Sequence, residues 1–84
     1  MSDDELLERM RANPRSDWTI ADIERLCRRL GLIATAPRRG SHYKIRGPNS
    51  GATLTIPARR PVKPVYIQAL VALADRHRAS GERK

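Results

Sequence analysis

The 84-residue sequence lacks several features that mark large classes of proteins. Its single cysteine, Cys27, excludes an internal disulfide, and the partners of a zinc site are missing, so we expect a small buried side chain on a helix. No apolar run approaches the roughly 20 residues that cross a bilayer, so no membrane partner is expected. The chain starts with an acidic stretch, unlike a secretory signal, which predicts a cytoplasmic protein.

Acidic residues are missing from most of the chain. From Arg25 to Ala74 there are ten lysines or arginines and no aspartate or glutamate, whereas four acids crowd the first eight residues. A basic stretch of this length without acids indicates a polyanionic partner, and we favour nucleic acid. The alternative is a solvated basic surface that serves solubility, which suits scattered charges better than a complete absence of acids.

The length allows one small domain over residues 1–84, which buries about 60–65% of the surface of its unfolded chain. Ser2 and Glu5 match a capping box, which predicts a short leading helix within residues 1–13 that stops before Pro14. The main body is expected over residues 17–79. Residues 80–84 are expected to form a frayed tail.

Two further helices are expected. Thr19 and Asp22 predict a helix start, Trp18 just before it is placed to pack on Ile23, and Gly31 ends the helix, which therefore spans residues 19–30. The last helix begins at Pro64, and its apolar face is predicted to contain Tyr66, Ile67, Leu70, Val71, Leu73 and Ala74. Near its end lies His77, which suits the negative end of a helix and is interpreted as structural.

Three strands are expected between these helices, at residues 32–36, 42–46 and 52–56, with a five-residue loop at 47–51. Side chains alternate along a strand, so His42, Lys44 and Arg46 share one face, while Tyr43 and Ile45 share the other. Leu54 and Ile56 should point inward and the threonines beside them outward. The predicted fold is therefore α+β, a three-stranded antiparallel sheet with both helices on its apolar face plus the leading helix, in the α-β-β-β-α order of double-stranded-RNA-binding domains.

Residues 57–64, which we call the basic strap, contain three prolines and three positive charges and should be extended and stiff.

Three blocks of sequence resemble the HicA family of bacterial toxin–antitoxin systems, which are small ribonucleases. The blocks are Gly40-Ser41-His42-Tyr43-Lys44, Leu54-Thr55-Ile56-Pro57 and Val62-Lys63-Pro64-Val65-Tyr66, and the resemblance covers residues 13–73. It implies an mRNA interferase that cleaves RNA with His42 and is neutralised by a HicB-type antitoxin. Many members carry another histidine shortly after the proline that ends the third strand, where this chain has Arg59 and Arg60.

Metal-independent RNA cleavage needs a base for the 2′-hydroxyl proton, an acid for the leaving 5′ oxygen and positive charge for the phosphate between them. His42 can do either proton task. No metal or other cofactor is expected, and the free toxin is expected to be a monomer. The candidate RNA-binding residues are Arg38, Arg39, Ser41, Lys44, Arg46, Arg59, Arg60 and Lys63.

Other interpretations stay open at this point. Ser41 can contact a phosphate or merely shape the turn, and the turn is favoured; Tyr43 is expected to pack. An RNA-binding module that cuts nothing is the main alternative, and it uses the same basic face. A DNA-binding regulator is weaker, because no recognition helix flanked by a tight turn is evident.

Overall fold

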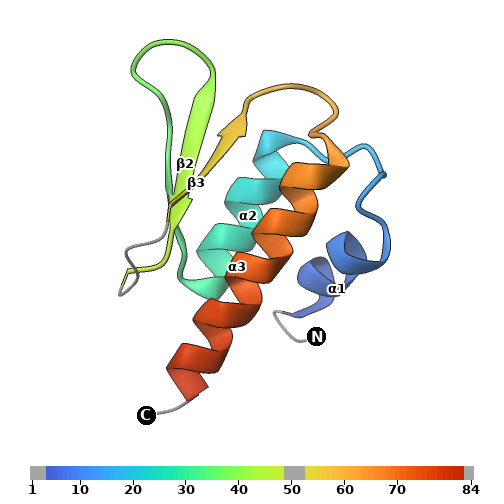
Figure 1. Ribbon diagram of the computed structural model, residues 1–84, viewed down its shortest axis with the longest axis vertical. Coiled ribbons are helices and arrows are strands. Elements are labelled where there is room, and N and C mark those ends of the chain that lie inside the picture. Colours follow the sequence, from blue (N-terminus) through green and yellow to red (C-terminus); the bar gives the residue numbers. More distant parts are fainter. Residues whose placement is uncertain (1–3, 49–52, 83–84) are drawn as a thin grey trace.

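The computed structural model describes residues 4–48 and 53–82 of the chain, which form three helices and one sheet (Figure 1). The elements follow in the order α1 (Asp4–Ala12), α2 (Ile20–Leu30), β1 (Ile33–Thr35), β2 (His42–Arg46), β3 (Thr53–Pro57) and α3 (Pro64–Glu82). The strands pair in the order β1-β2-β3, and both pairings are antiparallel. The predicted α+β fold with its leading helix is confirmed.

The sheet has one apolar and one polar face, as predicted. Ile45 and Ile56 are fully buried, and Tyr43 and Leu54 pack against the core from the same face. The opposite face carries exposed side chains, namely His42, Lys44, Arg46, Thr53 and Thr55. Helix α2 packs on β1 and α3 on β3, so the two helices cover the apolar face and leave the basic one open.

Helix α2 shows how local sequence fixes its ends. Thr19 caps the N-terminus and forms a reciprocal capping box with Asp22, and Gly31 ends the helix in the left-handed conformation, with φ of 78°. The Leu32 N–H donates to the Cys27 carbonyl at 2.9 Å and so belongs to this helix end. The first strand is therefore shorter than the predicted 32–36 and comprises only Ile33–Thr35.

Helix α1 packs against α3, on the side of α3 away from the sheet (Figure 1). Leu6, Leu7 and Met10 are buried and join the main core. Arg11 donates two hydrogen bonds of 2.8 Å to the carboxylate of Asp75 in α3. The leading helix is therefore part of the folded body; Ser2 of its predicted capping box lies outside the described residues.

Helix α3 continues to Glu82, past residue 80 at which the frayed tail was expected to begin. No proline or glycine lies between Asp75 and Ser80 to end the helix earlier. Part of the predicted loop at 47–51, and Ala52 of the third predicted strand, lie outside the described residues. Among the helices of residues 4–48 and 53–82, none is long and apolar enough to span a membrane.

Candidate active site

The hairpin of β2 and β3 holds His42 at one end. His42 is the first residue of β2 and pairs with Pro57, the last residue of β3. The contact between the two strands continues one residue further, since the Ala58 N–H donates to the Ser41 carbonyl. The backbone at His42 is thus fixed, while its side chain is exposed.

Gly40 sets the turn that leads into this end of the hairpin. Its φ is 79°, in the left-handed region, and no atom lies within 4 Å of the place that a Cβ would occupy. Glycine is favoured here because of the backbone conformation and not because of crowding. The Gly-Ser-His sequence therefore has a structural basis: Gly40 turns the chain, Ser41 accepts the last hairpin bond, and His42 begins the strand.

The basic strap is held at a buried anchor between two exposed cations. Val62 is 1% exposed, and its N–H donates to the carbonyl of Trp18 at 2.8 Å. Arg59 and Lys63, on either side of this anchor, are exposed. The Arg60–Pro61 peptide bond in the strap is cis. The strap is not extended throughout, as was predicted, because the Arg59 N–H donates to the Pro57 carbonyl at 2.9 Å and the chain bends at Arg60 and Pro61. Val62 ties the middle of the strap to the core.

Trp18, whose carbonyl accepts the Val62 hydrogen bond, is itself held in place by contacts with α1 and the residue after it. Its ring is buried, and its indole N–H donates to the Asn13 carbonyl at 2.7 Å. The Arg9 guanidinium of α1 lies 5.8 Å from the ring centroid, within the range of a cation–π contact. The structural role predicted for Trp18 is confirmed, and through it the strap is connected to the end of α1.

The start of α3 brings Lys63 and Tyr66 to the same side. The Lys63 carbonyl accepts hydrogen bonds from the N–H groups of Tyr66 at 3.0 Å and Ile67 at 3.3 Å, so Lys63 lies at the beginning of the helix. Residues three apart in a helix lie on neighbouring surface positions. Tyr66 is half-buried, whereas Ile67 points fully into the core.

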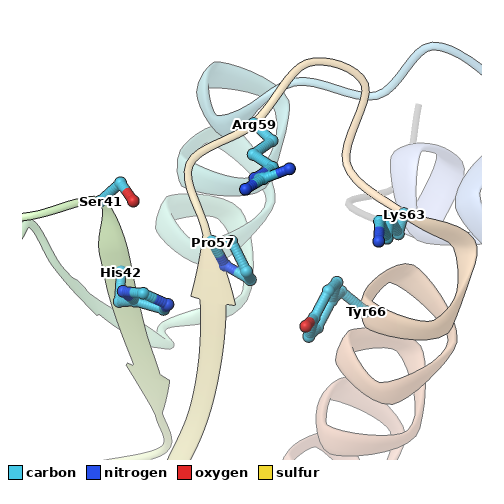
Figure 2. Close-up of a pocket in the computed structure, with 6 residues that line it drawn as sticks. All are labelled: Ser41, His42, Pro57, Arg59, Lys63 and Tyr66. Atoms are coloured by element: carbon cyan, nitrogen blue, oxygen red, sulfur yellow. The ribbon is translucent and has the colours of Figure 1, made fainter.

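A cleft of about 230 Å³ lies between the end of the hairpin, the basic strap and the first turn of α3 (Figure 2). In Figure 2, His42 of β2 and Ser41 just before it lie on one side of the cleft, and Lys63, just before α3, and Tyr66 of α3 lie on the other. The guanidinium of Arg59 reaches in from the strap. The lining residues are Ser41, His42, Pro57, Arg59, Lys63 and Tyr66.

The structure brings three of the eight predicted RNA-binding residues to His42, namely Ser41, Arg59 and Lys63. The other five do not line the cleft. Lys44 and Arg46 follow His42 along the exposed face of β2, Arg38 and Arg39 precede Gly40 in the loop after β1, and Arg60 lies in the strap; all five side chains are exposed. They add positive charge to the strand, the loop and the strap that lead to the cleft, but they do not line it.

Arg59 and Lys63 form no ion pair with an acid among the residues that the structure describes. Within residues 4–48 and 53–82, the ion pairs found involve Arg11 and Arg25, with Glu8, Asp75 and Asp22 as their partners. Arg59 and Lys63 lie in the stretch that contains no acid. This leaves both charges available to an anionic ligand.

Tyr66, like Pro57, is a lining residue that the sequence analysis did not assign to the site. Its position matches the apolar periodicity of α3, and it was therefore expected only to pack. It does pack against the core, but it also forms one wall of the cleft. The signal that could have found it is its place in the first helical turn, directly after the cationic strap.

Two other reactive residue types lie outside the cleft. Cys27 is 1% exposed, and burial raises the pKa of its thiol to about 11, so it does not serve as a nucleophile. The His77 Nε2 lies 2.7 Å from the Leu30 carbonyl at the end of α2, which fits the structural role expected for it, although the helix end that it caps is that of α2 and not of its own helix. His42 is thus the histidine of the cleft.

The described residues include no group of three His, Cys, Asp or Glu side chains that could hold a metal ion. The chemistry that the cleft offers is that of one imidazole, two permanent cations and two hydroxyl groups. Such a set can bind a phosphate and move a proton close to it.

Comparison of the chain with protein-family models, with curated proteins and with solved structures gives no match.

Proposed function

We propose that the protein is a ribonuclease toxin of the HicA type, which cleaves mRNA in the cytoplasm with His42 as its catalytic residue. The observation that carries the proposal is the position of His42: it is exposed in a cleft beside Arg59 and Lys63, and none of the residues that line this cleft is acidic. The three sequence blocks that resemble the HicA family meet at this cleft, since Ser41 and His42, Pro57, and Lys63 and Tyr66 come from one block each.

The proposed reaction is an internal transfer within RNA. The 2′-oxygen attacks the neighbouring phosphorus, the new bond closes a 2′,3′-cyclic phosphate, and the bond from phosphorus to the 5′-oxygen breaks. One proton leaves the 2′-hydroxyl and one joins the leaving 5′-oxygen. His42 gives or takes one of these protons, since an imidazole can act as a general acid or as a general base.

Arg59 and Lys63 supply the positive charge that the reaction needs. Negative charge builds up on the phosphate oxygens when the phosphorus is crowded by five oxygens, and fixed cations stabilise it. Arginine can bind two of these oxygens at once, whereas lysine acts as a single point of charge. The hydroxyl of Ser41 can donate to a third position of the same phosphate.

The test is metal-free incubation of RNA with the protein in EDTA, followed by analysis of the product ends. We expect 2′,3′-cyclic phosphate or 3′-phosphate ends, and a loss of at least about 100-fold in rate for His42→Ala, the lower limit for a general acid or base. His77→Gln is the matched control, because it removes the other histidine, which lies outside the cleft, and keeps a donor for the Leu30 carbonyl.

Two outcomes would contradict the proposal in different ways. Cleavage by His42→Ala at the parental rate, in a preparation free of host ribonuclease, would remove His42 from the mechanism. Binding of RNA without any cleavage by the parent would favour the RNA-binding module that does not cut. Circular dichroism of each variant shows whether the fold is retained, as we expect for an exposed side chain.

A HicB-type antitoxin is the partner that this function requires. We propose that it covers the cleft of the monomeric toxin and that its acidic side chains meet Arg39, Lys44 or Arg46 around the cleft. Such charge complementarity would speed association at low salt. Hydrogen-exchange protection confined to α2 and α3 when the complex forms would contradict this, and inhibition would then have to be indirect.

A further inference from the structure

We infer that Tyr66 stacks on one unpaired base of the RNA, next to the phosphate that is cleaved. The inference rests on the proposed ribonuclease function and adds the residue that positions the substrate. It starts from the two kinds of side chain that line the cleft. Ser41, His42, Arg59 and Lys63 offer polar or charged groups, whereas Pro57 and Tyr66 offer flat carbon surfaces (Figure 2).

Tyr66 is the aromatic side chain of the cleft among the residues that the structure describes. Trp18 is 7% exposed and lies in the core, and Tyr43 lies on the apolar face of the sheet. Tyr66 is half-buried, which leaves part of its ring open to the cleft. Its backbone N–H is bonded to the Lys63 carbonyl, so the ring is carried by an ordered helical turn.

The size of the cleft limits what it holds. At about 230 Å³ it is smaller than the roughly 300–1,000 Å³ of sites for drug-sized ligands, so a single base fits it better than a stack of bases. When the phosphate binds Arg59 and Lys63 and the ribose faces His42, the apolar surface left for the attached base is that of Pro57 and Tyr66. A base reaches that surface only when it is unpaired and unstacked from its neighbours.

Stacking on an aromatic ring is tolerant of sequence, because every base has a π face. Tyr66 is therefore expected to select unpaired over paired nucleotides and to discriminate only weakly between bases. Hydrogen-bonding groups that distinguish one base from another would have to come from elsewhere in the cleft.

The test measures binding of a short single-stranded RNA in which 2′-fluoro groups prevent cleavage. Tyr66→Leu should weaken binding by about 5- to 140-fold, the range found when an aromatic partner of one base is removed. Tyr66→Phe keeps the ring and should bind within about twofold of the parent. Tyr43→Leu is the matched control, because it removes a half-buried tyrosine that does not line the cleft.

A second set of oligonucleotides, each with one abasic position, separates stacking from damage to the fold. At one position, removal of the base should weaken the affinity of the parent for the oligonucleotide. The same removal should not lower the affinity of Tyr66→Leu any further, because this variant already lacks the partner of that base. A variant that is merely misfolded would lose affinity for all oligonucleotides equally.

The outcomes also separate this inference from the proposed function. Cleavage by the parent without coupling between Tyr66 and any base would overturn the stacking assignment and leave the ribonuclease in place. Coupling without cleavage would support Tyr66 and contradict the catalytic function. Equal affinity of the parent for single-stranded and duplex RNA would also contradict the inference.

Discussion

Gly40 illustrates how a single residue positions the cleft. Its left-handed backbone conformation is one that alanine adopts only with strain of about 1–2 kcal/mol, although the space for a methyl group is open. We predict that Gly40→Ala lowers the free energy of unfolding by about that amount and slows RNA cleavage, because the turn before Ser41 and His42 is disturbed. Gly40→Asn should cost less, since asparagine tolerates this conformation better. Urea unfolding of the three proteins measures the difference, and equal midpoints would contradict it.

The sequence predicted individual site residues where a local rule was sufficient. The alternation of strand side chains placed His42, Lys44 and Arg46 on the exposed face, as the structure has them. Local rules could not show that Arg59 and Lys63 reach His42, because this depends on the bond between Val62 and Trp18, which are far apart in the sequence. Local rules also assigned Tyr66 to the core, because helical periodicity does not distinguish a fully buried ring from a half-buried one.

At the scale of elements, α1 is held by side chains that enter the core. Met10 is fully buried in the main cluster, so Met10→Ala should lower the free energy of unfolding by about 2–5 kcal/mol, as for other large-to-small changes in cores. Met10→Leu keeps nearly the same volume and should cost less than about 1.5 kcal/mol. Denaturant unfolding compares the two variants, and a negligible effect of Met10→Ala would mean that α1 is not part of the cooperative unit.

The contact between α1 and α3 also predicts a dependence on pH. Hydrogen bonds from Arg11 hold the pKa of the Asp75 carboxyl below its ordinary value of 3.8. The folded state therefore binds this proton less tightly than the unfolded state, so the pair stabilises the fold above the ordinary pKa, and this stabilisation is lost as the pH falls through the lowered value. The effect should be small, because the two side chains are 41% and 44% exposed.

Thermal unfolding of Asp75→Asn across the acid range tests this linkage. Its midpoint should lie below that of the parent at neutral pH and approach the parental value in acid. Arg11→Gln should behave in the same direction, since it removes the other partner. A difference from the parent that does not change with pH would show that the carboxyl charge does not stabilise the contact.

Element boundaries were predicted less well than element types. Capping residues are specific, and they placed the start and end of α2 correctly. The first strand was expected to be longer, because the sequence does not show that the Leu32 N–H donates to the Cys27 carbonyl at the end of α2. The far end of α3 was expected to fray near residue 80, since the sequence offers neither a strong stop nor an apolar pattern there.

At the scale of the whole molecule, the position of the charges should matter more than their number. For single-stranded RNA, the slope of log affinity against log salt is about −0.7 per phosphate neutralised. Replacing Arg59, Arg60 and Lys63 by alanine should flatten this slope. Replacing Arg28, Arg29 and Arg76 removes as many charges from exposed positions that do not line the cleft, and the slope should stay close to the parental one. Equal slopes for the two triple variants would mean that binding follows net charge alone.

The bond from the Val62 N–H to the Trp18 carbonyl connects the basic strap to the segment that follows α1. The Trp18 indole donates to the Asn13 carbonyl, and its ring lies against the Arg9 guanidinium. We therefore expect the strap, the indole ring and the end of α1 to unfold locally together. A ligand that binds Arg59 and Lys63 should therefore slow amide hydrogen exchange at Val62 and also in α1, although the ligand makes no contact with α1. Coupling of this kind is reciprocal, so variants that loosen α1 should also release RNA more readily.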